Sequence, residues 1–282
     1  MLLWSASCLA VGSDKPQSHP QQFNVYQRDR MSETSHRRII IGDVHGHYEG
    51  LMTLLEAIAP GKRDQVYFLG DLIDRGPDSA RVVSFVQESP YHCLLGNHEQ
   101  LMLDSFPNGR PFTPALQAWL YSGGRATVAS YGSTGIPLDH LDWMQTLPTY
   151  LDLGDLWLVH AGVHPHLPLE QQSTQEFCWI RDEFHSSPRP YFTDKLIITG
   201  HTITFTLPKV MPGELAQGNG WLDIDTGAYH PKSGWLTGVD VDRRKVYQVN
   251  VFNYSSRVLQ LDEAIAKIDP GQVIAHRQAL HL

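Results

Sequence analysis

Residues 38–46 of this chain read RIIIGDVHG, and residues 65–76 read QVYFLGDLIDRG. Each stretch is a short apolar run followed at once by glycine and aspartate. Such a run is too short for a core helix, and its isoleucine, valine and phenylalanine are typical of a strand buried on both faces of a parallel sheet. Because glycine lets the chain turn sharply, we expect each aspartate at the end of its strand, on the edge of the sheet.

The segments after these two strands have the periodicity of helices. Residues 48–59 carry leucine or isoleucine at spacings of three and four, until Pro60 and Gly61 end the pattern. Residues 77–88 open with proline and aspartate and present three valines on one side. Because strand–helix–strand units of this kind form right-handed parallel crossovers, the sequence predicts an α/β fold.

Three further apolar runs end in the same way. Residues 92–95, 156–159 and 196–199 lead into GNHE, HAG and GHT, respectively. Taken singly, an aspartate after a strand is most often a helix N-cap, and a histidine is most often a core residue. The carboxyl ends of strands in open α/β sheets, however, form the edge where ligands bind. Five strand ends that each place Asp, Asn or His beside glycine therefore predict one shared metal centre.

After Thr206 the pattern changes to strand-like runs separated by turn residues. These runs, at residues 221–229, 233–241 and 244–252, predict an antiparallel meander. We expect the two halves of the chain to form an α/β/β/α sandwich, in which two mixed sheets are flanked by helices and the metal site lies at the carboxyl ends of the strands.

The sequence also suggests domain boundaries. Residues 1–35 are polar and rich in Gln, Ser and Pro, which predicts a disordered leader. Residues 36–255 are expected to form the catalytic domain. Residues 256–282 are expected to form a C-terminal tail, with one short amphipathic helix over residues 261–268 that docks on this domain.

The amino-acid composition argues against several classes of partner and location. Lys and Arg number 22 against 30 Asp and Glu, and the net charge of −8 argues against a non-specific nucleic-acid partner. Three cysteines without a CxxC pair are too few for a disulfide framework, whereas fifteen histidines favour a nitrogen-ligated metal. No run approaches the roughly 20 apolar residues of a membrane helix. The first basic residue, Lys15, follows the apolar leader, so we expect no export, no membrane partner and a cytoplasmic location.

The motifs GDVHG, GDLIDRG, GNHE, HAG and GHT, within residues 42–202, resemble the signature of the phosphoprotein phosphatase (PPP) family of metallophosphoesterases. Residues 123–132, 178–184 and 224–228 resemble its bacterial and phage-type serine/threonine protein phosphatases, which are related to the symmetrical diadenosine tetraphosphatases. The C-terminal loop signature of the eukaryotic branch is missing.

This resemblance implies two divalent metal ions that share the carboxylate of Asp71. It assigns Asp43 and His45 to one ion, and Asn97, His160 and His201 to the other. Two cations roughly 3.5–4 Å apart can generate a nucleophilic hydroxide at neutral pH and neutralise phosphoryl oxygens. The mixed oxygen and imidazole donors suit Mn²⁺ first, with Fe or Zn²⁺ as alternatives, and the lack of thiolates disfavours a structural zinc site.

The resemblance also assigns catalytic roles. His98 is the expected general acid and Asp74 its partner, which fixes the tautomer and favours the imidazolium. The alternative for His98 is a metal ligand or a structural hydrogen bond. Arg75 and Arg181 are the expected phosphate-binding residues.

Other residues near these motifs remain ambiguous. Arg189 is an alternative to Arg181 as the second phosphate-binding arginine. The alternative for Arg75 is a surface ion pair without a role in phosphate binding. His164 and His166 are expected as loop residues at the pocket rim. Glu99, Tyr131 and Trp179 fit either the substrate side of the site or structural roles.

The expected reaction is hydrolysis of phosphate monoesters by direct in-line attack of a metal-bound hydroxide. No GxSxG nucleophile motif and no GxxxxGK[ST] phosphate loop occurs in the chain. Phosphoserine or phosphothreonine proteins, with phosphotyrosine as an addition, or a small phosphoester are the expected substrates, because an acidic chain offers no basic groove for a polyphosphate. The alternatives are a dinucleoside polyphosphate hydrolase and a metal-binding regulatory module without catalysis.

Overall fold

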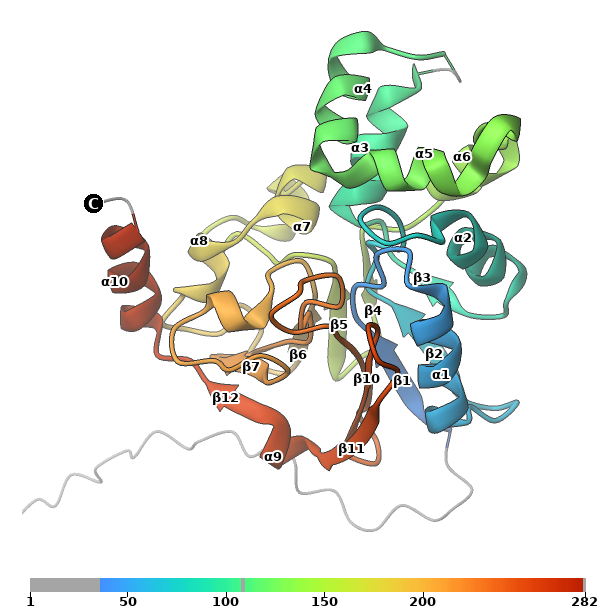
Figure 1. Cartoon of the computed structure of the whole chain (residues 1–282). Helices are drawn as coiled ribbons and strands as arrows, with labels where there is room; N and C mark the ends of the chain where they lie inside the picture. The colour runs from blue at the N-terminus through green and yellow to red at the C-terminus, as the bar shows by residue number, and fades with distance from the viewer. Residues whose placement is uncertain (1–35, 108–109, 281–282) are drawn as a thin grey trace, which may run out of the picture. The chain divides into compact units, whose positions relative to one another are not determined.

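Two six-stranded sheets form the centre of the computed structural model, which describes residues 36–107 and 110–280 (Figure 1). In the first sheet the order is β11 (Ser256–Gln260), β10 (Lys245–Asn250), β9 (Trp235–Asp240), β1 (Arg38–Ile41), β2 (Gln65–Phe68) and β3 (His92–Cys93). In the second it is β12 (Ile265–Lys267), β7 (Leu215–Gly218), β8 (Trp221–Asp223), β6 (Leu196–Thr199), β5 (Leu156–Val159) and β4 (Tyr150–Asp152). The leader predicted at residues 1–35 lies outside the described residues.

The alternation of side chains along β1 shows how the layers stack. Ile39 and Ile41 pack in one core with helices α1 (Tyr48–Ile58) and α2 (Ser79–Glu88), which connect β1 to β2 and β2 to β3. Ile40 points the other way, into the core between the two sheets. All three isoleucines are fully buried, as a strand covered on both faces requires.

The outer face of the second sheet carries the last helical layer. Trp157 and Ile197 of this sheet share a core with residues of α7 (Thr174–Trp179), α8 (Asp182–His185) and α10 (Pro270–Leu280). The order is therefore helix, sheet, sheet, helix, and the predicted α/β/β/α sandwich of two mixed sheets is confirmed.

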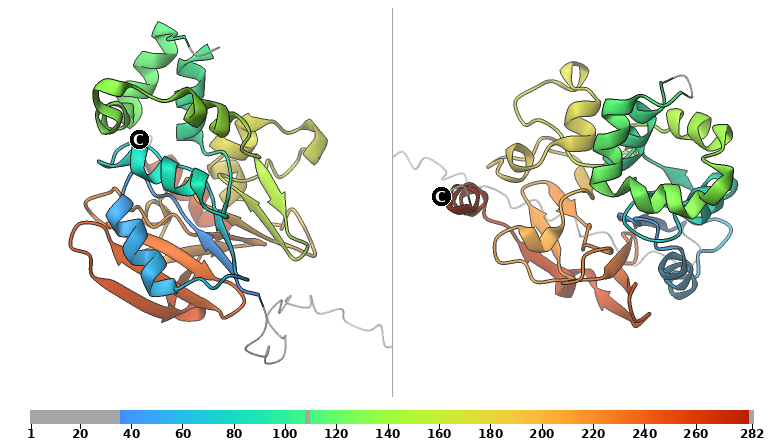
Figure 2. Two further views of the ribbon diagram at one scale, coloured as in Figure 1. Left: turned by 90° about the vertical axis from the view of Figure 1, so that its right-hand side faces the viewer. Right: turned by 45° about the horizontal axis from the view of Figure 1, so that its top comes forward.

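A group of helices lies between β3 and β4 in the chain. We call it the helical arm (residues 97–145); it contains α3 (Asn97–Ser105), α4 (Thr113–Trp119), a π-helical turn (Leu120–Gly124), α5 (Arg125–Tyr131) and α6 (Leu138–Gln145). These helices, drawn in green, stay grouped in every view (Figures 1 and 2). Single 3₁₀ turns occupy Gly132–Thr134, Leu169–Gln171 and Thr204–Thr206. Among the described residues, no helix is long and apolar enough to cross a membrane.

Three expectations for the C-terminal part do not match the structure. The run that begins at Trp221 does not join the meander, because β8 pairs in parallel with β6 in the second sheet; the meander is β9, β10 and β11. The helix expected over 261–268 is only α9 (Leu261–Ala264), after which the chain extends as β12. Since β11 and β12 add an edge strand to each sheet, residues 256–267 are integral to the sandwich and do not form a separate tail.

Candidate metal centre

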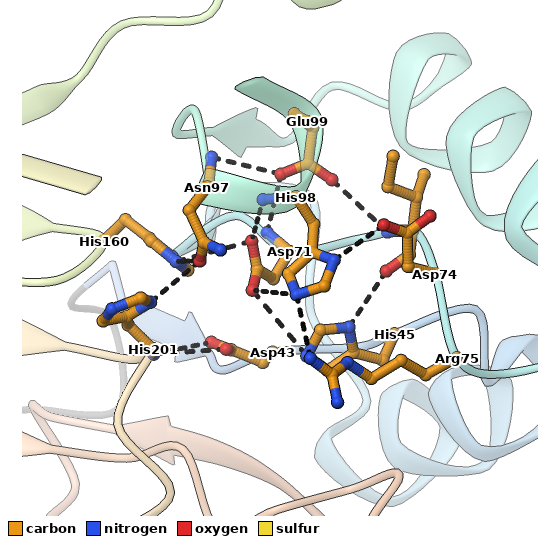
Figure 3. A network of polar contacts seen from close by, with 12 residues as sticks. Asp43, His45, Asp71, Asp74, Arg75, Asn97, His98, Glu99, His160 and His201 are labelled. Atoms are coloured by element: carbon orange, nitrogen blue, oxygen red, sulfur yellow. Dashed lines mark hydrogen bonds and ion pairs between the residues drawn. The ribbon is translucent and has the colours of Figure 1, made fainter. Parts of the chain in front are cut away.

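The loops after β1, β2, β3, β5 and β6 bring the predicted site residues together (Figure 3). Eight of them are buried: Asp43, His45, Asp71, Asp74, Asn97, His98, His160 and His201. Arg75 and Arg181 are exposed. Both arginines line a pocket of about 160 Å³, together with His45, Asp71, Asn97, His98 and His201.

His45, Asp71 and His98 form the first of two groups whose ligand atoms all lie within 4.8 Å of one another. His45 donates its Nδ1–H to a backbone carbonyl at 2.9 Å, so its Nε2 faces the Asp71 carboxylate at 3.7 Å. The Nε2 of His98 lies 3.9 Å from the same carboxylate. A backbone hydrogen bond of this kind fixes the tautomer and the ring orientation of a metal-binding histidine.

Asp71, His160 and His201 form the second group, and Asn97 lies between the two imidazoles. His160 donates Nδ1–H, and His201 donates Nε2–H, to backbone carbonyls at 2.9 and 3.3 Å. Their remaining nitrogens lie 2.9 and 2.8 Å from the Oδ1 of Asn97. Each neutral imidazole thus directs a lone pair at an oxygen that also carries lone pairs, and such a set of acceptors fits a cation.

Burial keeps these histidines neutral. It lowers the pKa of His45 to about 3, and it also lowers the pKa of His160 and of His201. Neutral imidazole is the form that binds metal ions. Because Asp71 belongs to both groups, the residues present fit two divalent cations that share its carboxylate.

Asp43 belongs to neither group, although it lies in the same cluster (Figure 3). Its two carboxylate oxygens accept the backbone N–H of His201 at 3.3 and 3.1 Å. Burial, with the nearby carboxylate of Asp225 second, raises the pKa of Asp43. The assignment of Asp43 to a metal stays a prediction. Asp225 itself lines the pocket, and sequence reasoning did not single it out although it lies within the IDTGA stretch at residues 224–228.

His98 and Asp74 form a hydrogen-bonded pair. The Nδ1 of His98 lies 2.6 Å from the Asp74 carboxylate. Burial opposes the charged imidazole, but Asp71 and Asp74 outweigh it and raise the pKa of His98. Its Nε2 lies 3.4 Å from an Nη atom of Arg75, beside the pocket. This geometry suits a general acid, and the place of His98 in the first group keeps the ligand alternative open.

The two predicted arginines occupy defined positions at the pocket. The guanidinium of Arg75 lies over the ring of Tyr229, with 4.2 Å between its Cζ and the ring centroid. Arg181 donates to the carbonyl of His201 and to the hydroxyl of Thr202, both at 3.1 Å. Tyr229 also lines the pocket, and it is a second residue that sequence reasoning missed.

The ambiguous residues lie in different places. Trp179 lines the pocket, whereas Arg189 lines a separate, smaller one. Tyr131 is buried with its hydroxyl 2.8 Å from a histidine ring nitrogen, away from the pocket lining. His164 and His166 are not among the residues that line the pocket.

Glu99 holds the loop that carries Asp71. Its fully buried carboxylate accepts the backbone N–H of Asp71, Leu72 and Ile73 at 2.8, 2.8 and 3.3 Å, and that of Gly96 at 3.1 Å. Asp71 has a φ of 48°, in the left-handed region that L-residues rarely adopt. Glu99 therefore does not face the substrate; it stabilises the strained backbone that presents the shared carboxylate.

We expect Glu99→Gln to lower metal affinity and turnover together. Glutamine keeps the size, but its NH₂ group must face backbone N–H donors, so the loop loses acceptors. Losses of this kind at residues that support metal ligands are typically about 10- to 100-fold. Metal titration and kcat/KM with p-nitrophenyl phosphate measure the effect, and the exposed Glu56→Gln is the matched control. Unchanged metal affinity in Glu99→Gln would contradict this role.

Comparison with known proteins indicates the family of the chain. A family model described as calcineurin-like phosphoesterase matches residues 36–230. Serine/threonine-protein phosphatase 1 of Salmonella typhimurium is 36% identical over 156 residues, which are 54% of this chain and 68% of that protein. An asymmetrical bis(5'-nucleosyl)-tetraphosphatase of Oceanobacillus iheyensis is 28% identical over 221 residues, 67% of this chain and 82% of that one.

A symmetrical bis(5'-nucleosyl)-tetraphosphatase of Legionella pneumophila is 33% identical over 128 residues, and the match spans only 44% of either protein. Among solved structures, one provisionally described as a diadenosine tetraphosphatase is similar with a TM-score of 0.55 and 20% identity, over 81% of this chain and 95% of that one. At this identity the likeness concerns the fold alone.

Proposed function

This chain belongs to the calcineurin-like phosphoesterase family, and we propose that it is a phosphoprotein phosphatase acting on phosphoserine and phosphothreonine, with phosphotyrosine as a further candidate substrate. The family and the clustered ligands indicate a metal-dependent phosphoesterase. The residues that line the pocket support monoesters as its substrates.

The number of positively charged side chains at the pocket favours phosphate monoesters over polyphosphates as substrates. Arg75 and Arg181 are the only lysine or arginine side chains that line the pocket in the described part of the chain. Two planar guanidinium groups can bind the oxygens of one phosphoryl group. A tetraphosphate bridge carries several more negative charges, and this pocket offers them no further lysine or arginine.

The residues of the pocket have separate roles in the proposed hydrolysis. When bound, the two divalent ions supply a nucleophile at neutral pH and neutralise charge on the phosphoryl oxygens, and we propose Mn²⁺ as the metal. Arg75, whose plane lies over Tyr229, and Arg181 orient the phosphoryl group. His98 directs Nε2 toward the pocket and can protonate the leaving oxygen, while Asp74 holds its Nδ1–H.

A dinucleoside polyphosphate hydrolase is the second candidate. Relatives from Oceanobacillus iheyensis and Legionella pneumophila carry tetraphosphatase names, and the first match covers 82% of that protein. The same metal centre could serve both reactions, since the attack on phosphorus is common to them.

The test compares kcat/KM for a panel of phosphopeptides with that for diadenosine tetraphosphate, at equal enzyme concentration with added Mn²⁺. We expect the best phosphopeptide to have the higher value. A higher value for the dinucleotide would replace the proposal by the second candidate. If no substrate, including p-nitrophenyl phosphate, turns over with Mn²⁺, Fe²⁺ or Zn²⁺, the chain is a binding module. Enzyme stripped with a chelator is the control.

A further inference from the structure

Asp74, the hydrogen-bond partner of His98, has a carboxylate that is held from several sides. Its fully buried carboxylate accepts three donors: His98 Nδ1–H at 2.6 Å, the hydroxyl of Thr127 at 2.6 Å, and the indole N–H of Trp119 at 2.9 Å to one oxygen and 3.1 Å to the other. The backbone N–H of Asp74 returns to the Thr127 hydroxyl oxygen at 2.9 Å. Because both carboxylate oxygens accept hydrogen bonds, rotation of the carboxylate would break them, and its plane is fixed.

All three donors come from the helical arm, and His98 lies in its first helix, α3. Trp119 ends α4 and Thr127 lies in α5, and both side chains are fully buried. The π-helical turn between these helices contacts Arg75, the residue after Asp74. The carbonyl of Gly123 in this turn accepts the backbone N–H of Arg75 at 3.3 Å. Gly123 has a φ of 126°, and a Cβ built on it would lie only 2.8 Å from the Cγ of Arg75.

The loop that the arm contacts is strained. Asp74 and Arg75 both have a φ of 71°, which non-glycine residues rarely adopt. Such a conformation persists only where surrounding contacts determine it. Here those contacts include the indole of Trp119, the hydroxyl of Thr127 and the carbonyl of Gly123.

We infer that Trp119 and Thr127 are positioning residues for proton donation: by holding the Asp74 carboxylate, they aim the Nε2 of His98 at the leaving oxygen. Neither residue lines the pocket, so each acts through Asp74. The inference rests on the acid role of His98 in the proposed function, but on no particular natural substrate.

The test uses a pair of aryl phosphates, p-nitrophenyl phosphate and phenyl phosphate. The nitrophenolate leaves readily without a proton, whereas phenolate needs the acid more. We expect Thr127→Val, which keeps shape and removes the hydroxyl, to lower kcat for phenyl phosphate about tenfold or more, a part of the roughly 10²–10⁴ that general acid catalysis contributes. The loss for p-nitrophenyl phosphate should be several times smaller. Thr127→Ser should restore both values.

Trp119→Phe provides an independent variant should Thr127→Val fold poorly. It removes one N–H and keeps an aromatic ring in the core, and the same split between the two substrates is expected. Trp143→Phe, in α6 of the same arm and packed against the same core, is the matched control and should leave the ratio unchanged. Equal losses on both substrates, or no rescue by Thr127→Ser, would overturn the inference.

A second readout does not depend on turnover. The short bond to Asp74 should give the Nδ1 proton of His98 a downfield NMR signal, assigned by its absence in His98→Asn. In protein loaded with diamagnetic Zn²⁺, we expect Thr127→Val and Trp119→Phe to shift or broaden this signal while metal content stays full. An unchanged signal in both variants would overturn the inference. Failure of the proposed function can be distinguished from failure of this inference. The proposed function is tested by kcat/KM for phosphopeptides compared with diadenosine tetraphosphate, whereas this inference is tested with aryl phosphates and NMR.

Discussion

Asp71→Asn should abolish turnover and leave the purified protein with little bound metal. Asp71 is the one residue present in both candidate ligand groups of the described chain, and asparagine removes the negative charge that two cations would share. Elemental analysis of metal content and kcat with p-nitrophenyl phosphate measure the two effects. Asp139→Asn, an exposed carboxylate on α6, is the matched control and should behave like the wild type.

The outcome that contradicts this assignment is specific. Full metal content in Asp71→Asn would show that the shared carboxylate is not what holds the ions. Loss of one ion with the other kept would assign Asp71 to a single metal, and the arrangement of two groups around one residue would then need another bridge.

His98→Asn should keep both metals and lower kcat on a phosphoserine peptide by about 10²–10⁴, the usual contribution of general acid catalysis. Asparagine cannot deliver a proton to the leaving oxygen, whereas the backbone N–H of residue 98, which donates to Asp71 at 3.0 Å, is retained. The loss on p-nitrophenyl phosphate should be much smaller, since its leaving group hardly needs a proton.

This variant also separates the two roles open to His98. The Nε2 of His98 lies 3.9 Å from Asp71 in the first candidate group, so metal binding is a real alternative. A loss of metal content in His98→Asn would place it among the ligands. Equal losses on the peptide and the aryl phosphate, at full metal content, would mean that it acts on the phosphoryl group.

The strand-end motifs could be predicted from the sequence because each is local. A buried apolar run, a glycine and a polar residue within five positions indicate where β1 and β2 end and which side chains stand at their ends, as at Asp43 and Asp71. The sandwich is predicted by the same pattern, since strands apolar on both faces need cover on both sides.

The features that the sequence did not predict depend on distant partners. The run at Trp221–Asp223 has an ordinary strand composition, and nothing in it specifies β6 in the second sheet as its neighbour. The sequence left Glu99 open between the substrate side and a structural role for a related reason: its partners are backbone N–H groups, which every residue but proline carries. Trp119 lies 45 positions from the aspartate that it contacts.

The loop at residues 71–76 also bears on any attempt to transplant this chemistry. Its backbone N–H groups donate to Glu99, Thr127 and Gly123, all in the helical arm, and at Gly76 to the carbonyl of His45. If only the ligand side chains were transferred to another scaffold, this loop would lack these hydrogen bonds. We therefore expect its backbone to adopt ordinary turns and the ligand side chains to move apart. A design would need to transfer the loops after β1, β2 and β3 together with the helical arm as one unit.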